Sequence, residues 1–447
     1  MVRIVFVVLS VAALVSCGGG GGGDGTDATL PASPQAQQLL KARNVPSTAP
    51  LVAGPVSVVN TTTAGDQVLR SIGATSDGGY VVAWISSGST LYTQAYDSAG
   101  AKAAAQTPIP LDVGAATQAA AAQAVQASAV AVLNDGTVVV VYSVSRNTDQ
   151  PGGTVLTRTG VYFQRFDANG VQLAGETEVA SREDVVNYRT PVTNQLTATA
   201  LSDAGFVVGW AVSGFSAQFG SISTLSLRWF DSQGRPVGSP VEVGQFPALT
   251  YDVVADPRGG FTLSTSELDN FFKTEVSAFH YDANHGFQQI VAPRFGAALL
   301  LPVEDGYVLF DGGADGVTAQ MLDSQGSPVG TPTAFASMPI AARELADGSN
   351  VAILHAGGGF AAQRFARDGT PIGEPLAIDS NAAMPTVVAL ADTGFAAAWS
   401  AASANGDSDV YTQRFVERFS DRKKACLNAA KGLKGQQRKA FVDACMA

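Results

Sequence analysis

Short apolar stretches separated by glycine-bearing turns recur along the chain from about residue 55 to residue 418. One recurring type of stretch begins with a turn and continues into an apolar run that often ends in an aromatic residue, as in D-G-G-Y-V-V-A-W from Asp77 to Trp84. Runs this short, bounded by turns and without helical spacing, are typical of β-strands. Seven copies are present, beginning at Asp77, Asp135, Ala204, Gly259, Asp305, Asp347 and Thr393.

Each copy has one short apolar run before it and, in most cases, two strand-like runs after it. The third run, such as V-Y-F-Q-R-F from Val161 to Phe166, leads through a turn into a fourth with a proline or small residue near its start, such as Arg235 to Val243. Four antiparallel strands repeated at intervals of roughly 40 to 50 residues predict the blades of a β-propeller. The expected fold class is therefore all-β, with a seven-bladed β-propeller over residues 54–418 and a small C-terminal α-helical hairpin.

The two ends of the repeat complement each other. The seventh copy has a third strand, Val410 to Phe415, with no fourth strand after it, whereas a spare strand-like segment, Gly54 to Val59, lies before the first copy. We expect the spare segment to complete the last blade, because this pairing closes the ring and removes exposed sheet edges.

The blade elements resemble those of bacterial propeller proteins whose blades carry D-G-G-F-V-V-A-W followed by Q-R-F-D-x-x-G. The resemblance covers about four fifths of the chain, and it is weakest in the fourth and fifth copies, where Thr265 and Asp311 stand in place of tryptophan. It implies the fold and not the activity, because propellers serve as hydrolases, lyases, dehydrogenases and binding platforms alike.

Composition narrows the class of protein. Of the 447 residues 46% are hydrophobic and 15% are charged, which is enough apolar material for a large core. The formal net charge of −11 argues against a nucleic-acid partner, because such a chain has little to neutralise phosphates.

The N-terminus has the pattern of an export signal. Arg3 is followed by an apolar run from Ile4 to Val15, which is too short for a permanent membrane span. The run ends in L-V-S-C at Cys17, which resembles the lipobox of bacterial lipoproteins. The resemblance implies that residues 1–17 are a lipoprotein signal peptide ending at Cys17, which becomes lipidated, and that the chain attaches to the membrane there. Gly18 stands where inner-membrane retention signals usually have aspartate, so the expected location is the outer membrane of the cell envelope.

Residues 18–53 follow as a tether rich in Gly, Pro, Ser and Thr, beginning with six glycines. A flexible chain of this length has a root-mean-square span of about 30 Å. The folded part is therefore expected to stand clear of the lipid surface.

The recurring polar residues are interpreted as structural. Aspartate opens a D-x-x-G-like turn, where its side chain accepts backbone N–H bonds; a calcium loop would need alternate oxygen ligands. The glutamines of the third strands are expected to bond neighbouring blades, with aromatic residues and tryptophans in the core. The aspartates are Asp97, Asp167, Asp231, Asp282 and Asp323; the glutamines are Gln94, Gln164, Gln320, Gln363 and Gln413.

Residues for metal or covalent chemistry are few. His280, His285 and His355 do not have the spacing of metal ligands. No G-x-S-x-G motif or spare cysteine offers a nucleophile, and the S-x-D-x-G-x-x-W box of sialidase-like propellers is not matched. The sequence therefore assigns no catalytic, cofactor-binding or metal-binding residue. Its abundant carboxylates leave open a glycosidase that uses a pair of them.

Connection lengths point to one face of the propeller. Tight connections fall between first and second strands and between third and fourth, on one face. Long connections fall on the opposite face, between second and third strands and between blades: Ser143 to Gly160, Ala211 to Thr224, Ser400 to Asp409, Leu111 to Ala124 and Ala180 to Asn194.

Because rigid scaffolds often carry functional residues on loops, a ligand is expected on the long-loop face. Drift in unconstrained loops would give the same pattern. The candidate binding residues are Arg146, Asp149, Arg182, Glu183, Asp184, Tyr188 and Arg189.

The last segment, residues 419–447, differs from the rest of the chain in charge and composition. From Arg418 onward the chain has eight basic and two acidic residues, a net charge of +6. The remainder of the chain therefore has a net charge of −17. Alanine- and lysine-rich runs around a Gly432 to Gly435 break predict a basic helical hairpin. Cys426 and Cys445 lie one in each helix of an exported chain, so we expect a disulfide between them.

The K-A-C, K-G-L-K-G and R-K-A-F…C elements of this tail resemble the PsiF repeat of phosphate-starvation-inducible periplasmic proteins. The resemblance implies a compartment more than an activity. The hairpin is expected either to cap the acidic propeller or to contact anionic lipid, phosphate or a partner.

Two functions remain open. The first is a monomeric, lipid-anchored propeller that acts as a binding or scaffolding module for a protein or glycan of the cell envelope, without a cofactor. The alternative is a carbohydrate-active or other hydrolytic enzyme with a carboxylate site at the propeller face or the central tunnel.

Overall fold

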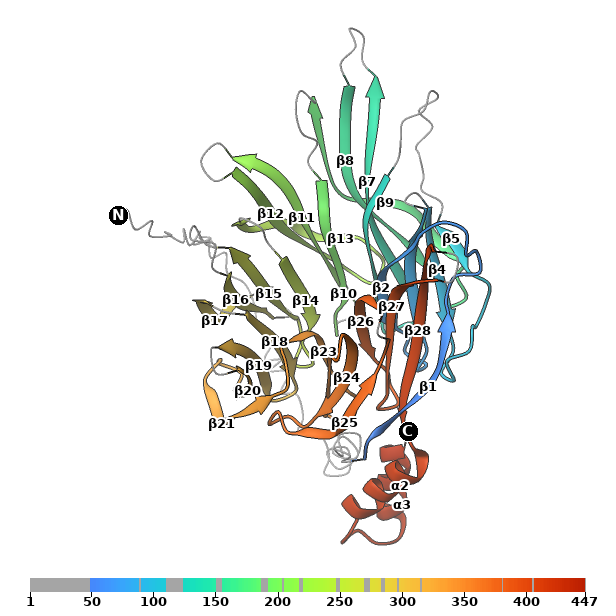
Figure 1. The fold of residues 1–447 in the computed structure, drawn as a ribbon, viewed down its shortest axis with the longest axis vertical. Coiled ribbons are helices and arrows are strands. Elements are labelled where there is room, and N and C mark those ends of the chain that lie inside the picture. Colours follow the sequence, from blue (N-terminus) through green and yellow to red (C-terminus); the bar gives the residue numbers. More distant parts are fainter. Residues whose placement is uncertain are drawn as a thin grey trace, which may run out of the picture.

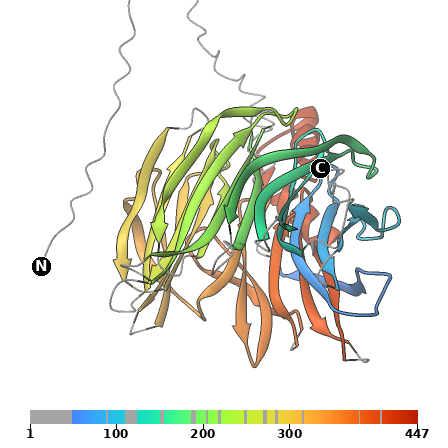
Figure 2. The same cartoon turned by 90° about the horizontal axis from the view of Figure 1, so that it is seen from above.

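The computed structural model describes residues 49–446 except 88–89, 110–123, 150–154, 186–191, 203–204, 217–219, 247–249, 269–273, 283–285, 296, 314–315, 380 and 404–405. Seven four-stranded antiparallel sheets surround a central axis (Figure 1) and stand side by side when the molecule is turned by 90° (Figure 2). The prediction of an all-β, seven-bladed β-propeller followed by helices is confirmed.

The strands of the first six blades follow one another in chain order within each sheet. Blades one to three comprise β2 (Gln67–Ala74), β3 (Tyr80–Ser86), β4 (Thr90–Tyr96), β5 (Thr107–Ile109), β6 (Ala124–Val132), β7 (Val138–Asp149), β8 (Val155–Phe166), β9 (Gln172–Val185), β10 (Val192–Ala200), β11 (Phe206–Ser216), β12 (Gly220–Phe230) and β13 (Pro236–Phe246). Blades four to six comprise β14 (Thr250–Ala255), β15 (Phe261–Leu268), β16 (Thr274–Tyr281), β17 (Phe287–Phe295), β18 (Ala297–Val303), β19 (Gly306–Gly313), β20 (Gly316–Leu322), β21 (Pro328–Phe335), β22 (Pro339–Glu344), β23 (Asn350–Ala356), β24 (Gly359–Phe365) and β25 (Pro371–Ala377). Blade seven comprises β26 (Ala383–Ala389), β27 (Phe395–Ala402), β28 (Ser408–Glu417) and β1 (Leu51–Val58).

The hydrophobic core lies between blades. Second strands such as β3 and β27 are buried along almost their whole length, because neighbouring sheets cover both of their faces. This explains why these strands are continuous apolar runs in the sequence. Trp84 and Trp399 are almost completely buried in the layers between blades seven and one and between blades six and seven.

The ring closes as predicted. β1 pairs with β28 in antiparallel register, with Leu51 opposite Glu417 and Val58 opposite Tyr411. The pairing continues at Asn60, whose side chain donates to Asp409 at 2.7 Å and accepts from the backbone N–H of Val410 at 2.9 Å. The N-terminal strand is therefore the outer strand of the last blade.

The two faces of the propeller differ. We call the face with the tight turns between first and second and between third and fourth strands the turn face, and the opposite one the hairpin face. On the hairpin face β7 and β8 have 12 residues each and β9 has 14, compared with 7 in β3 and β4. β11, β12 and β13 have 11 residues each. Figure 1 shows β7 and β8 reaching beyond the other strands.

The interpretation of these segments as long loops was therefore wrong in part. Most of Ser143 to Gly160 and of Ala211 to Thr224 is strand, and strand also covers both ends of Ala180 to Asn194 and of Ser400 to Asp409. Their Ser- and Thr-rich sequence looks like a loop, but cross-strand backbone hydrogen bonds need no apolar side chains, and threonine and valine favour strands. The remaining segment, residues 111–123, lies outside the described residues.

The tail forms α2 (Phe419–Ala429) and α3 (Gly435–Met446). The expected Cys426–Cys445 disulfide joins them, and both cysteines pack with Ala430 and Phe441 in a small core. Within the described ranges, no helix is long and apolar enough to cross a bilayer. The expected signal peptide with Cys17, and the tether up to residue 48, lie outside these ranges.

Candidate functional site

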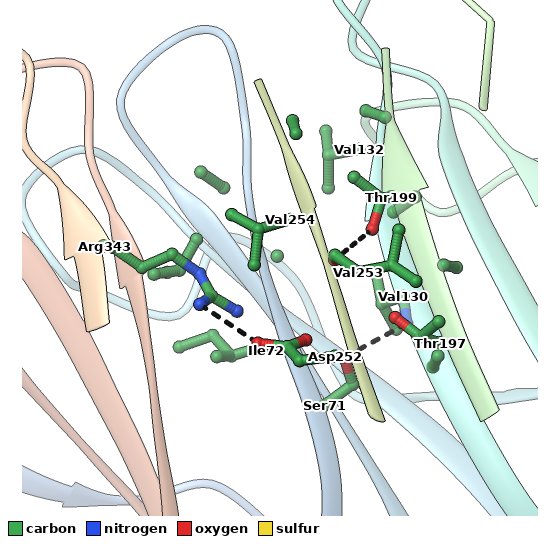
Figure 3. A pocket seen from close by; sticks show the side chains of 18 of the residues that line it. Ser71, Ile72, Val130, Val132, Thr197, Thr199, Asp252, Val253, Val254 and Arg343 are labelled. Carbon is green, nitrogen blue, oxygen red and sulfur yellow. Dashed lines mark hydrogen bonds and ion pairs between the residues drawn. The ribbon is translucent and has the colours of Figure 1, made fainter. Parts of the chain in front are cut away.

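A central pocket of about 610 Å³, which we call the channel, lies between the blades (Figure 3). Its walls come from the first strand of every blade, β2, β6, β10, β14, β18, β22 and β26, which are the innermost strands of the ring. Valine, alanine and threonine are the most frequent lining residues, as at Val130, Thr197 and Val253, and charged side chains are few. The channel is therefore mostly uncharged, so each charged residue in it stands out.

Two arginines, Arg70 and Arg343, line the channel. Arg343 on β22 faces Asp252 on β14, with 3.6 Å between Nη1 and Oδ2, and so links blades six and four (Figure 3). Arg70 lies in β2 where the register shifts between Leu69 and Ser71, so it is the extra residue of a β-bulge. The Nε of Arg70 is buried without a hydrogen-bond partner among the described residues, and burial lowers the pKa of its guanidinium.

Three carboxylates surround one arginine where blades five and six meet on the turn face. Arg367 contacts Glu304 at 2.8 Å and Glu344 at 3.2 Å, and it also pairs with Asp305. Glu344 ends β22 and lines the channel, and its side chain is only 15% exposed. Burial raises the pKa of Glu344 to about 7, although the charge of Arg367 acts in the opposite direction.

The fourth blade, one of the weakest repeats, contains a second charged cluster. Asp256 occupies the position where most blades have a buried leucine, and its carboxylate contacts Arg258 at 2.5 Å and His280 at 3.2 Å. Burial raises the pKa of Asp256, but the contacts with His280 and Arg258 outweigh it and hold that pKa below its usual range. Arg258 also lies over the ring of Tyr307, 4.4 Å from its centroid.

This cluster replaces an ion pair that other blades make. In blade six the arginine of the third strand, Arg364, pairs with Asp347 of the first turn, and in blade seven Arg414 pairs with Asp392. His280 stands at the arginine position of blade four, so its place on a strand was predictable from the repeat, whereas its partner was not. Across the described ranges, no group of three His, Cys, Asp or Glu side chains is arranged to hold a metal ion.

The recurring aspartates are turn residues, as expected. In Asp97, Asp167, Asp231 and Asp323, Oδ1 accepts the backbone N–H groups two and four residues further on, at 2.8 to 2.9 Å. Asp282 accepts the N–H of Gly286 at 2.7 Å.

The expectation that the glutamines bond neighbouring blades was wrong. Gln320, Gln363 and Gln413 donate to backbone carbonyls of the fourth strand of their own blade, for example Gln413 to Gly54 at 2.8 Å. Gln94 donates to the carbonyl of Ala104, just before the fourth strand of its blade, at 2.7 Å. In three of these blades the glutamine lies where the register to the fourth strand shifts. A bulge leaves carbonyls without ladder partners, and the amide satisfies one of them. Gln164 instead donates to Tyr142 in the same blade, at 3.0 Å.

The candidate binding residues lie on strands of blade two as far as they are described. Arg146 on β7 is opposite Arg158 on β8, and Arg158 is opposite Glu183 on β9, so one row crosses three strands. Asp149, Arg182 and Asp184 lie on the same elongated strands. Tyr188 and Arg189 fall outside the described residues.

Comparisons with known proteins agree on the fold alone. No family model matches the sequence, and no curated protein matches it. Among solved structures, a protein of unknown function from Dyadobacter fermentans DSM 18053 is similar over 82% of this chain and 99% of its own, with 12% identity and a TM-score of 0.46.

Two carbohydrate enzymes are also similar in structure. The polysaccharide lyase Uly1 has 10% identity and a TM-score of 0.49 over 80% of this chain and 91% of its own. The Hadza microbial sialidase Hz136 has 11% identity and a TM-score of 0.40 over 76% of each chain. Similarity at this level says nothing about ligand or reaction.

Proposed function

We propose that the protein is a binding module of the cell envelope, anchored through a lipidated Cys17, whose partner contacts the elongated strands of blades two and three. The observation that carries this proposal is the asymmetry of the hairpin face: strands of 11 to 14 residues occur side by side in two of the seven blades. Ring closure needs only short blades, so the extra length serves something other than the ring.

The elongated part of blade two has the composition of a recognition surface for a polar partner. Its paired positions are mainly Ser, Thr, Asn and charged residues, and the Arg146, Arg158 and Glu183 row combines both signs of charge. Complementary charges across an interface favour specificity and fast association. A protein or a glycan of the envelope fits this chemistry.

The location in the envelope is supported by three features. The apolar run before Cys17 and the L-V-S-C sequence resemble a lipoprotein signal, and Gly18 favours the outer membrane. The Cys426–Cys445 disulfide fits an oxidising compartment. Detergent-phase partition and the intact mass of the exported protein, compared with a Cys17→Ser variant, test the anchor.

The proposed binding surface is tested by shortening the β-hairpin formed by β7 and β8. Ser145 and Thr159 are cross-strand partners, so an Asn-Gly turn can replace residues 146–158 between them. The shortened protein should keep its thermal stability and lose the partners that the wild type recovers from envelope extracts. Glu374→Arg, on the exposed outer strand of blade six, is the control and should keep them. Identical partner sets for all three proteins would rule out this surface.

A second candidate is a hydrolytic enzyme, which the Glu304, Asp305 and Glu344 cluster favours. A buried carboxyl with a pKa of about 7 is suited to donate a proton near neutral pH, and adjacent carboxylates can act as base or nucleophile. The three groups share Arg367 and lie at the turn-face end of the channel.

Release of reducing ends from envelope polysaccharides distinguishes the enzyme from the binding module. An enzyme using this cluster would lose at least about a hundredfold of its rate in Glu344→Gln. No release by the wild type, or equal release by both proteins, would remove this candidate.

A further inference from the structure

Both ends of the folded chain lie together on the turn face. Leu51, where β1 begins, is opposite Glu417, where β28 ends, and α2 starts two residues later. In Figure 1 the two helices lie at the end of the molecule away from the tips of β7 and β8. The chain that leads back to Cys17 and the helical hairpin therefore leave the propeller from the same place.

Buried ion pairs fix the helical hairpin of α2 and α3 on the turn face. Asp347, in the first turn of blade six, pairs with Arg364 and lies 4.0 Å from Arg422 of α2. Arg422 also donates to the carbonyl of Cys445 in α3 at 3.1 Å. Arg364 donates to the carbonyl of Ala49 at 2.7 Å, so one cluster holds the N-terminal segment, blade six and the hairpin together.

The outer surface of the hairpin is strongly basic. Six of its Lys and Arg residues are exposed, and of these the described structure shows an ion pair only for Lys439, with Asp443 at 2.5 Å. Leu427 is 36% exposed and lies one helical turn after Lys423 on α2. We call these exposed basic residues of the helical hairpin the basic patch: Lys423, Lys424, Lys431, Lys434, Arg438 and Lys439.

The patch contrasts with the rest of the protein. The chain before Arg418 has a net charge of −17, so an anionic surface repels the propeller and attracts the hairpin. Lysines around an exposed leucine combine electrostatic attraction with a small apolar contact, as in segments that lie at lipid headgroups.

We propose that the basic patch binds the anionic phospholipid headgroups of the membrane that holds the N-terminus. This turns the turn face toward the lipid and the elongated strands of blades two and three away from it. The orientation rests on the proposed anchor at Cys17, whereas the lipid contact itself does not. The segment of about 30 residues between Cys17 and Ala49 would tether the patch to the same membrane and raise its local concentration near the headgroups, so a weak contact is sufficient.

The contact is tested with the full chain bearing Cys17→Ser, which has no lipid of its own. It should co-sediment with vesicles of phosphatidylglycerol and phosphatidylcholine, and not with phosphatidylcholine alone. Replacing Lys423, Lys424, Lys431 and Lys434 by Gln should weaken binding at least about tenfold, and replacing them by Arg should preserve it, since the attraction is electrostatic. Helical circular dichroism checks that all variants keep the hairpin.

Three results would overturn the proposal: equal binding to uncharged vesicles, unchanged binding of the glutamine variant, or no binding to either vesicle. Displacement by millimolar inorganic phosphate at constant ionic strength would show a phosphate-ion site and would also overturn it. Failure of lipidation at Cys17 appears separately, in the mass of the exported protein, and leaves the vesicle result intact.

Discussion

At the scale of single residues, recurrence separates scaffold from possible function. The turn aspartates and the bulge glutamines recur in most blades and bond backbone groups of their own blade. The charged residues of the channel do not recur. Arg70, Asp252 and Glu344 each occupy a first-strand position that is uncharged in most other blades.

Glu344 should make stability depend on pH. Its folded-state pKa of about 7 lies above its usual value of 4.5, so between these values the folded state binds more protons than the unfolded state. The free energy of unfolding therefore falls as pH rises through this interval. Glu344→Gln should reduce that fall by about 2 to 3 kcal/mol, at about 1.4 kcal/mol for each pKa unit.

Urea unfolding at about pH 5 and about pH 8 measures this difference. Glu374→Gln, on the exposed strand β25, is the matched control and should behave like the wild type. If Glu344→Gln shows the same decline as the control, ionisation of Glu344 does not cause it.

The charged clusters could not be predicted from the sequence. Arg367, Glu304 and Glu344 come from two blades, and each looks like an ordinary turn or strand residue until the blades are side by side. Asp256 replaces a leucine in a weak repeat, and only the contact with His280 and Arg258 explains why a carboxylate is tolerated there.

At the scale of elements, the strands were predicted well where the repeat is strong. The blade number and the pairing of the ends followed from the recurring apolar runs, because a second strand covered on both faces has to be apolar throughout. The elongation of β7 to β9 was missed, because polar residues at the end of a hairpin carry no burial pattern.

The helical hairpin should depend on its disulfide. Its core consists of four buried residues, two of which are the bonded cysteines. Removing the bond by Cys426→Ser and Cys445→Ser should cost the hairpin about 3 kcal/mol, since it closes a loop of about 20 residues. The propeller has its own cores between blades and should be unaffected.

Two signals follow these parts separately during urea unfolding. The helical far-ultraviolet signal should be lost earlier in the double variant, whereas fluorescence of the buried Trp84 and Trp399 should change at the wild-type urea concentration. A common shift of both signals would mean that hairpin and propeller unfold as one unit.

At the scale of the whole molecule, β1 should determine whether the ring stays closed. A chain beginning at residue 60 lacks β1 and exposes the edge of β28, which is open to pairing with other chains. We expect its melting temperature to drop by more than about 10 °C and its monomer fraction to fall, measured by calorimetry and light scattering.

A chain beginning at residue 49 keeps β1 and serves as the control. A synthetic peptide of residues 49–60 should restore the melting temperature of the shorter chain by adding the missing strand. A monomeric shorter chain with wild-type stability would show that ring closure contributes little.

The position of β1 also determines how the protein responds to force. A pull on the N-terminal chain acts first on the hydrogen bond between Ala49 and Arg364, and then on the pair formed by Leu51 and Glu417. Because β1 runs antiparallel to β28 and is loaded at the end where the chain enters, its ladder opens one bond at a time. Tension on the N-terminal segment would therefore peel the closing strand from the ring before any blade is sheared.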